Sequence, residues 1–353
     1  MLTMMFGQGE VLVIVIITAV VVFLLVRRRK KRDIIMKKIA TPLIMILVLS
    51  SIALHSCQTA PSGQAPIVRI GYLNLVTSLP LFIAQEKGFL TAQGIKFEAI
   101  PVATSNQLAD ALIAGDLDCY IGASVVPVFA AELQSPGRMK VFTASEITPE
   151  QPFDALLVKN GSAIKNLSDL SGKRIAVFPG STATNLLKTY LRAQGLDVST
   201  ITFVDLPPAQ HLDALKVGFV DVIHAYEPTI AIALSQNSAE ILHGSVYAAI
   251  LSPNPISVSV VSTDFLKNHP QTAKKTIAAL QRAAAFMKEN DRETRSILLK
   301  NMELSQDAAN RCSLLYMLPH DKIDPANLQR FANLLTDIGE LNATVSSDIL
   351  LYP

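Results

Sequence analysis

Short runs of hydroxyl and amide side chains recur along the chain, each directly after an apolar segment with the pattern of a buried strand. Most of these runs precede a segment with helical periodicity, and the first turn of a helix offers unpaired backbone N–H groups and the positive end of the helix dipole. Such places suit a small hydrogen-bond acceptor, above all an anion. The alternative is that each hydroxyl only caps its helix. The candidate ligand-binding residues are Asn74, Thr77, Ser78, Ser105, Asn106, Ser124, Gly180, Ser181, Thr182, Tyr226 and Glu227.

Groups that would point to catalysis or metal binding do not accompany these runs. No Ser/His/Asp arrangement, paired carboxylates or Gly-rich phosphate loop is evident in the sequence. The spacing of His211 and His224 matches no metal motif. We therefore expect a binding protein, with no catalytic residues, no metal site and no cofactor.

The chain contains an internal repeat. An Ala-Gln-Gly-Ile stretch at 92–95 is followed by an Asp-Ala-Leu segment at 110–118, and both are echoed at 193–196 and 213–221. Two similar α/β units that face each other form a cleft, and clefts between domains are common places for small ligands. The alternative is an old duplication without a shared site.

The elements that would position the runs alternate along the chain. Strands are expected at 67–72, 96–102, 119–122, 140–144, 174–178, 202–205 and 221–224. Helices are expected between them at 79–90, 106–114, 125–133, 167–170, 183–194, 209–217 and 229–236. This alternation favours parallel sheets. The carboxyl ends of parallel strands meet at one edge of the sheet, so the hydroxyl and amide runs that follow the strands would lie together there. A helical tail follows at 271–288, 293–300, 306–316 and 325–341.

Two further apolar segments, 153–158 and 256–261, are interpreted as crossings between two lobes. Lobe I is expected to contain 67–155 plus 252–353, and lobe II 156–251. The predicted fold is thus two α/β lobes joined by two hinge segments, with a helical C-terminal tail. Glu227 then has three interpretations: a ligand for an amine-bearing solute, a cap for the following helix, or a partner across the lobes.

The N-terminal region reads as targeting sequence. An apolar run at 11–26 and a basic block at 27–32 approach the length of a membrane span. A second start at Met36 opens an export signal over 36–56, whose Leu-His-Ser-Cys end resembles a bacterial lipobox with Cys57 as the lipidated residue. His55 departs from the usual small residue. The alternatives are a two-helix anchor with unmodified Cys57, and a 1–35 extension from a wrong start; a tether occupies 57–66.

Composition excludes other classes. The 353 residues carry a net charge of +2, no Trp and 6% aromatic residues, so there is no electrostatic or stacking case for nucleic acid. Apart from Cys57 the cysteines are Cys119 and Cys312, which have no framework spacing. An exported protein can form a disulfide between them, but we favour two buried thiols.

Several stretches together resemble the substrate-binding proteins of bacterial ABC importers, in the nitrate/sulfonate/taurine and thiamine-precursor-like group. The resemblance covers about 67–265, and its motifs are Ile-Gly-Tyr at 70–72, Leu-Pro-Leu-Phe-Ile-Ala at 79–84, Leu-Ile-Ala-Gly-Asp-Leu-Asp at 112–118, Leu-Ser-Gly-Lys-Arg at 170–174, Gly-Ser-Thr-Ala at 180–183 and His-Ala-Tyr-Glu-Pro at 224–228.

The resemblance implies a type II periplasmic-binding fold whose lobes close on a solute. It further implies delivery of the solute to ABC permease and ATPase subunits. Together with the export signal, we expect a monomer that is anchored by lipid to the bacterial membrane and faces the periplasm or cell exterior. The positions that match family ligand contacts are Thr77, Ser78, Ser105, Ser124, Ser181, Thr182 and Tyr226. Tyr226 stands where related sequences often carry Trp.

The identity and charge of the solute stay open. The hydroxyl runs contain no Lys or Arg, so a sulfonate or nitrate-like oxyanion would be held by neutral donors. A neutral thiamine-precursor-like pyrimidine would instead rely on Tyr226 and Tyr72. A membrane-anchored sensor is a further alternative. An enzyme of the thiamine-pyrimidine synthase type would carry a cysteine-rich run that this chain lacks.

Overall fold

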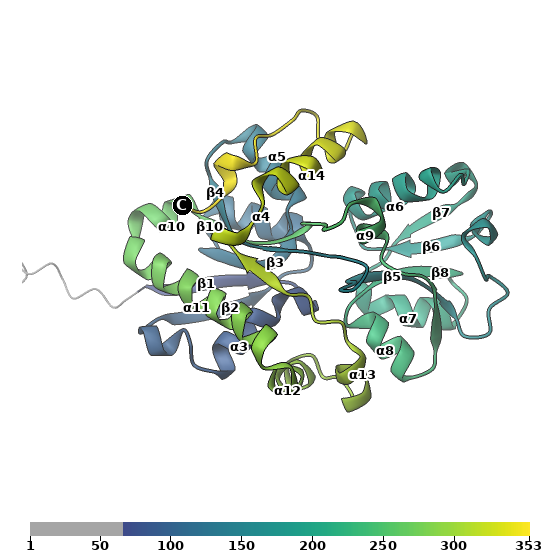
Figure 1. Cartoon of the computed structure of the whole chain (residues 1–353), viewed down its shortest axis with the longest axis horizontal. Helices are drawn as coiled ribbons and strands as arrows, with labels where there is room; N and C mark the ends of the chain where they lie inside the picture. The colour runs from purple at the N-terminus through teal and green to yellow at the C-terminus, as the bar shows by residue number, and fades with distance from the viewer. Residues whose placement is uncertain (1–65) are drawn as a thin grey trace, which may run out of the picture. The chain divides into compact units, whose positions relative to one another are not determined.

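The computed structural model describes residues 66–353, which form two α/β lobes (Figure 1). The predicted extension at 1–35, the signal at 36–56, Cys57 and nearly all of the tether lie outside the described residues. Among residues 66–353 no helix combines the length and the apolar character that a membrane span requires.

Lobe I is the unit built on the six-stranded sheet, whose strand order is β11-β4-β10-β3-β1-β2. Its strands are β1 (Ile67–Tyr72), β2 (Lys96–Pro101), β3 (Cys119–Ser124), β4 (Met139–Ser145), β10 (Ser257–Ser262) and β11 (Met317–Pro319). Its helices are α3 (Leu79–Glu86), α4 (Ser105–Ala114), α5 (Val126–Gln134), α10 (Thr263–Asn268), α11 (Pro270–Glu289), α12 (Asp291–Asn301) and α14 (Pro325–Asp337). Between α12 and α14, the short helix α13 (Gln306–Arg311) packs against α8 (Thr229–Ser235) of lobe II.

Lobe II is built on a five-stranded sheet with the order β7-β6-β8-β5-β9. Its strands are β5 (Asp154–Lys159), β6 (Arg174–Val177), β7 (Thr202–Asp205), β8 (Val222–Tyr226) and β9 (Ala239–His243), and its helices are α6 (Ser181–Ala193), α7 (Pro208–Lys216), α8 (Thr229–Ser235) and α9 (Val246–Ile250). Apolar side chains alternate along β5: Leu156 and Val158 enter one core cluster, and Ala155 and Leu157 enter another. The sheet is therefore covered on both faces, as its central strands require.

The sequence repeat corresponds to a repeated ion pair. In lobe I the guanidinium and backbone N–H of Arg69 both donate to the Asp118 carboxylate, with a shortest guanidinium distance of 2.9 Å. In lobe II Arg174 and Asp221 form the same arrangement, also at 2.9 Å. Each pair joins the start of a strand to the turn that enters its parallel neighbour, so both lobes set the same strand register by the same contact.

The two-lobe fold with a helical tail is confirmed, but the expectation of parallel sheets is wrong for two central strands. β10 runs antiparallel to β3 and β4, and β5 runs antiparallel to β8 and β9. Both strands come directly from a crossing between the lobes, so they enter their sheets at the edge where the parallel strands end. This direction brings the start of each crossing strand to the edge that faces the other lobe.

The crossings also differ from the predicted hinge segments. The segments 153–158 and 256–261 are essentially β5 and β10, while the connections between the sheets occupy 146–153 and 251–256. The apolar, β-branched pattern belongs to the strands and not to the connections. The two connections pair with each other, since Ile147 and Asn254 exchange backbone hydrogen bonds of 3.0 and 2.8 Å.

Other local predictions need smaller corrections. The helix expected at 306–316 ends at Arg311, and the following residues add β11 to the sheet edge beside β4. The elements β9, α9 and α10 were not anticipated. Cys119 and Cys312 are both buried and free, so the prediction of two buried thiols is confirmed.

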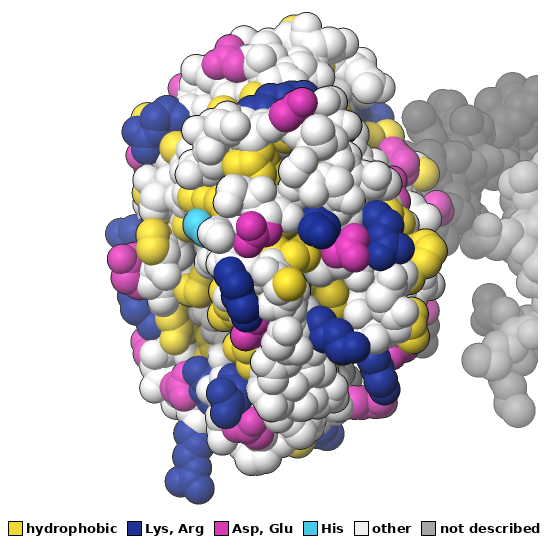
Figure 2. Space-filling view, turned by 90° about the vertical axis from the view of Figure 1, so that its right-hand side faces the viewer, with side chains coloured by type: hydrophobic (Ala, Val, Ile, Leu, Met, Phe, Trp, Pro, Cys, Tyr) yellow, Lys and Arg dark blue, Asp and Glu magenta, His cyan; other side chains and the backbone are white. Residues whose placement is uncertain are grey.

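The outward face of lobe II carries charges of both signs. Figure 2 shows Lys and Arg side chains interspersed with Asp and Glu over this face, with apolar side chains between them. Such mixed charge gives this face no electrostatic footprint for a nucleic acid backbone.

Gly122 is required where β3 passes the turn before α3. Its φ is +62°, and a Cβ at this position would lie 2.1 Å from the backbone oxygen of Thr77. We predict that Gly122→Ala lowers the free energy of unfolding by about 3 kcal/mol, because it adds overpacking to an unfavourable φ. Gly137→Ala is the matched control, since Gly137 has a φ of +76° with nothing within 4 Å and should cost about 1 kcal/mol. Equal losses in urea unfolding would contradict this account.

Candidate ligand-binding site

A cavity of about 90 Å³ lies between the two lobes, at the edges where the parallel strands end. A single water needs roughly 10–15 Å³ on the same measure, so the cavity has room for a small solute. None of the described residues that line it is charged. They are Leu73, Leu75, Thr77, Thr104, Ser105, Asn106, Gly122, Ser124, Pro127, Phe153, Phe178, Pro179, Gly180, Ser181, Thr182, Ala183, Tyr226, Tyr247, Ile256 and Ser257.

Eight of the eleven candidate residues therefore come together at this cavity: Thr77, Ser105, Asn106, Ser124, Gly180, Ser181, Thr182 and Tyr226. Asn74, Ser78 and Glu227 do not line it. Asn74 is exposed, whereas Ser78 and Glu227 are buried behind the lining.

Three lobe I hydroxyls at the cavity accept backbone N–H groups and keep a free O–H. Thr104 caps α4 by accepting the Gln107 N–H at 3.2 Å. Ser105 accepts the backbone N–H of Ser124 at 3.0 Å, and Ser124 accepts that of Val126 at 3.2 Å. Because a hydroxyl both donates and accepts, all three can still donate a proton to a solute.

The hydroxyls of Thr77 and Ser78 are used differently. Thr77 donates to the carbonyl of Gly122 at 2.6 Å, and Ser78 donates to that of Ile121 at 3.4 Å. Both bonds join the turn before α3 to β3 and are buried. Thr77 therefore forms part of the cavity wall, Ser78 supports the turn behind it, and neither hydroxyl has a free proton for a solute.

On the lobe II side, the cavity meets the N-terminus of α6. The helix begins after Gly180, which has a φ of +117° and no side chain to cap the first turn. No hydrogen bond to the backbone N–H of Ser181, Thr182 or Ala183 is found among the described residues. Three N–H groups at the positive end of a 13-residue helix thus remain for a ligand.

Aromatic side chains form the remaining wall. Phe153 stacks on Tyr226 with ring centroids 5.2 Å apart and an interplanar angle of 6°, and Phe178 lies against the same tyrosine at 5.8 Å. The Tyr226 hydroxyl is 2.6 Å from that of Tyr247. Burial raises the pKa of both phenols, so they stay neutral. The wall suits the apolar or planar part of a solute.

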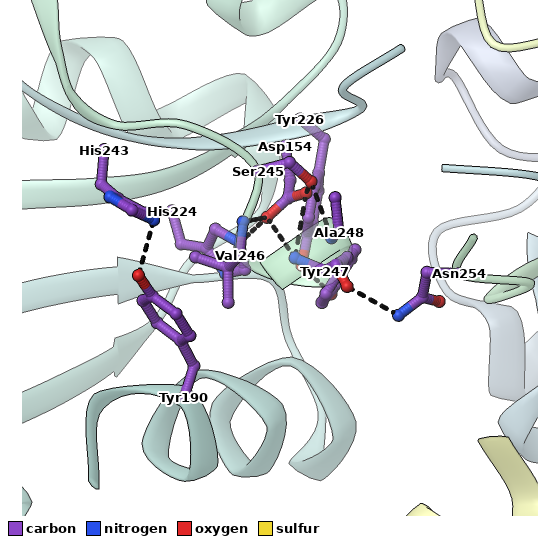
Figure 3. Close-up of polar contacts among 10 residues, drawn as sticks. All are labelled: Asp154, Tyr190, His224, Tyr226, His243, Ser245, Val246, Tyr247, Ala248 and Asn254. Carbon is purple, nitrogen blue, oxygen red and sulfur yellow. Dashed lines mark hydrogen bonds and ion pairs between the residues drawn. The ribbon is translucent and has the colours of Figure 1, made fainter. Parts of the chain in front are cut away.

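A buried carboxylate holds this wall in place (Figure 3). Asp154 accepts hydrogen bonds from His224 at 2.8 Å, from the Val246 N–H at 2.9 Å and from the Ser245 hydroxyl. The Tyr247 N–H lies 3.4 Å from the same carboxylate. Asp154 thus caps α9 from the first residue of β5, and it fixes the elements that carry both tyrosines.

Glu227 faces away from the cavity. Its carboxylate accepts the Ala231 N–H within α8 and the Ser313 N–H after α13, both at 3.1 Å. It therefore caps its own helix and joins lobe II to the C-terminal tail, and both of these arrangements were among its three interpretations. Burial raises the pKa of Glu227 to about 7, although the two backbone donors favour the ionised form and lower the pKa.

The histidines considered as metal ligands, His211 and His224, lie within the core of lobe II. Both are fully buried, and burial lowers the pKa of His211 to about 4. His211 bonds to the Leu206 carbonyl and His224 to Asp154. No group of three or more metal-ligating side chains is found within residues 66–353.

Sequence reasoning missed several lining residues, above all Ser257. Its side chain is 4% exposed, lines the cavity, and its hydroxyl has no hydrogen-bond partner among the described residues. Such an orphaned buried hydroxyl calls for an explanation, and a bound solute supplies one. Ser257 begins β10, so an antiparallel assignment for that strand would have placed it at the cleft.

The family model described as NMT1-like matches residues 62–302. The chain belongs to the NMT1-like family. A putative aliphatic sulfonates-binding protein of Escherichia coli (strain K12) is 27% identical to it over 279 residues, which are 76% of this chain and 82% of that protein.

Solved structures share the fold of this family member. The alkanesulfonate-binding protein SsuA from Xanthomonas axonopodis pv. citri, bound to MOPS, matches with a TM-score of 0.68 and 22% identity over 82% of this chain and 99% of that one. The desulfurization enzyme DSZB matches with a TM-score of 0.58 and 18% identity, over 81% of this chain and 96% of that one. The fold thus occurs in a binding protein and in an enzyme.

The buried Glu227 carboxylate makes stability depend on pH. Its pKa is about 7 in the folded protein, above the ordinary glutamate value of 4.5, so the folded state holds the proton more tightly. Its contribution to the free energy of unfolding is therefore fully present below pH 4.5 and falls by about 3 kcal/mol as the pH rises through 7.

We predict that the unfolding free energy of wild type falls by about 3 kcal/mol relative to that of Glu227→Gln between pH 4.5 and pH 8, because only wild type has to ionise this buried side chain. Urea unfolding at several pH values measures this difference. The exposed Glu303→Gln controls for the loss of a surface carboxylate. A difference that does not change with pH would show that burial does not perturb Glu227.

Proposed function

We propose that this protein is an extracytoplasmic solute-binding protein of an ABC importer. It captures a small solute in the cavity between its lobes and delivers it to permease and ATPase subunits. The observation that carries the proposal is the uncharged cavity, which is lined by helix N-termini, by hydroxyls that can still donate, and by the buried Ser257 hydroxyl that has no partner among the described residues. The NMT1-like family and the sulfonate-binding relative support the same function.

The preferred solute is an organic oxyanion with one negative charge, such as a sulfonate. The backbone N–H groups at the α6 N-terminus and the hydroxyls of Ser105, Ser124 and Ser257 would bind the oxyanion. The wall of Phe153, Phe178 and Tyr226 would pack against the organic part. Nitrate would use the donors and leave the wall unfilled. A neutral pyrimidine would use the wall, so it is the second candidate.

Catalysis has less support than binding. The lining contains no Cys, His, Asp, Glu, Lys or Arg, so its hydroxyls have no general base beside them. The carboxylates of Asp154 and Glu227 are buried behind the lining and committed to backbone donors. The geometry therefore favours capture and release of an unchanged solute.

A ligand panel tests the proposal. Thermal shift and calorimetric titration with ethanesulfonate, taurine, nitrate and a 4-amino-pyrimidine compare the candidate classes, because a ligand of the native state raises its apparent stability. We expect saturable binding of ethanesulfonate at one site. Tight binding of the pyrimidine alone would overturn the proposal of an anionic solute and leave the proposed import function in place. Conversion of a bound compound into a product would overturn the binding-protein assignment.

Ser257 gives a residue-level prediction. Ser257→Ala removes one donor to the solute and should weaken ethanesulfonate binding by about 1–3 kcal/mol, measured by titration. Thr294→Val is the matched control, because Thr294 also has a buried hydroxyl with no partner within residues 66–353 but lies in α12, outside the cavity lining. Equal affinity in wild type and Ser257→Ala would remove Ser257 from the site.

We also propose that the mature protein is a monomeric lipoprotein anchored through Cys57, with the signal at 36–56 removed. The support is the export signal and its lipobox-like end. Cys57→Ala should abolish the lipid mass and either release the protein into the soluble fraction or leave its signal uncleaved, as intact-mass analysis and fractionation would measure. Unchanged mass and membrane retention would contradict the anchor. Neighbouring genes for a permease and ATPase favour import, whereas a neighbouring kinase gene favours sensing.

A further inference from the structure

Glu340 connects the C-terminal tail to the N-terminal turn of α6. One carboxylate oxygen accepts hydrogen bonds from the hydroxyls of Ser181 at 2.7 Å and Thr182 at 2.8 Å. The other accepts from the Asn185 amide at 2.6 Å. A single side chain on the lobe I side thus makes three charge-assisted hydrogen bonds with lobe II, beside the mouth of the cavity.

The backbone that carries Glu340 is held firmly on lobe I. Its N–H donates to the Leu335 carbonyl at 2.8 Å, in the turn that ends α14, and Leu335 and the following Leu341 are buried in the lobe I core cluster. At the other end of α14, Asn327 donates to the Pro253 carbonyl of the connection between the lobes at 2.9 Å. Figure 1 shows the end of α14 reaching toward α6. The side chain therefore extends from a fixed base.

The contacts divide the donors of the α6 N-terminus into two sets. Ser181 and Thr182 each have one O–H proton, and both protons are directed to Glu340. The backbone N–H groups of Ser181, Thr182 and Ala183 donate to no acceptor among the described residues. All three residues line the cavity. Glu340 therefore occupies the side-chain donors of this turn and leaves its backbone N–H groups available to a solute.

We propose that Glu340 is a latch that holds lobe II against lobe I and sets how long a solute remains in the cavity. Opening the cleft breaks all three of its hydrogen bonds and separates its charge from the positive end of α6. Glu340 does not line the cavity, so it acts on the solute by positioning α6. The effect on solute release rests on the proposed function, whereas the effect on lobe closure does not.

The test uses Glu340→Ala and Glu340→Gln in the full chain. Glutamine keeps an acceptor for the hydroxyls but loses the charge, so it should give an intermediate result. For ligand-free protein, small-angle scattering should show a larger radius of gyration in Glu340→Ala than in wild type. In stopped-flow experiments, release of ethanesulfonate should be about tenfold faster, with little change in the association rate.

Two controls separate a latch from a general structural role. Asp337→Asn removes a charge three residues away, at the exposed end of α14, and should match wild type in both measurements. Thr182→Ala and Glu340→Ala should be non-additive in a double-mutant cycle on the release rate, because they remove the same contact.

The outcomes are distinct. If Glu340→Ala matches Asp337→Asn in radius of gyration, the latch is overturned, whatever the protein binds. If wild type does not bind ethanesulfonate, the sulfonate proposal fails and the scattering result alone decides on the latch. If release is unchanged while the ligand-free lobes open, Glu340 closes the empty cleft but does not retain the solute, which overturns its role in residence time.

Discussion

The arrangement of the cleft depends on one buried carboxylate, Asp154. Its side chain is fully buried, so its charge or its polarity has to be met by donors within the fold. The donors come from β8 through His224 and from the start of α9 through Ser245 and Val246. Since Asp154 opens β5 directly after one connection and α9 leads into the other, the same contacts tie together the two routes between the lobes. They also fix Tyr226 and Tyr247, which line the cavity.

The direction of the crossing strands then builds the site. β5 and β10 enter their sheets antiparallel to their neighbours, so Phe153 and Ser257 arrive at the edge where β8 and β3 end. The parallel strands supply helix N-termini and capping hydroxyls at this edge, and the crossing strands add an aromatic ring and an orphaned hydroxyl. Binding in such a site relies on many neutral dipoles and not on a counter-ion, so selectivity follows from where the donors point.

Much of this was predictable from the sequence because it is local. β1 has the predicted bounds, the repeat predicted two similar lobes, and eight of the candidate residues line the cavity. The features that were missed depend on contacts between distant segments. Nothing in the neighbourhood of Glu340 in the sequence indicates that it reaches Ser181, and the β-branched pattern of β10 does not state its direction. The capping role of Glu227 was foreseen as one of three interpretations, but only its packing against Ser313 shows which donors it meets.

In this protein, we propose, a small solute binds between the lobes on neutral donors of both lobes. A crystal structure of the full-length protein with ethanesulfonate tests it most directly. We expect closed lobes with sulfonate oxygens within hydrogen-bond distance of the N–H groups at the start of α6 and of the Ser257 hydroxyl, and with the ethyl group against Tyr226. A sulfonate held by a Lys or Arg on one lobe, with the cavity between the lobes filled only by water, would contradict it.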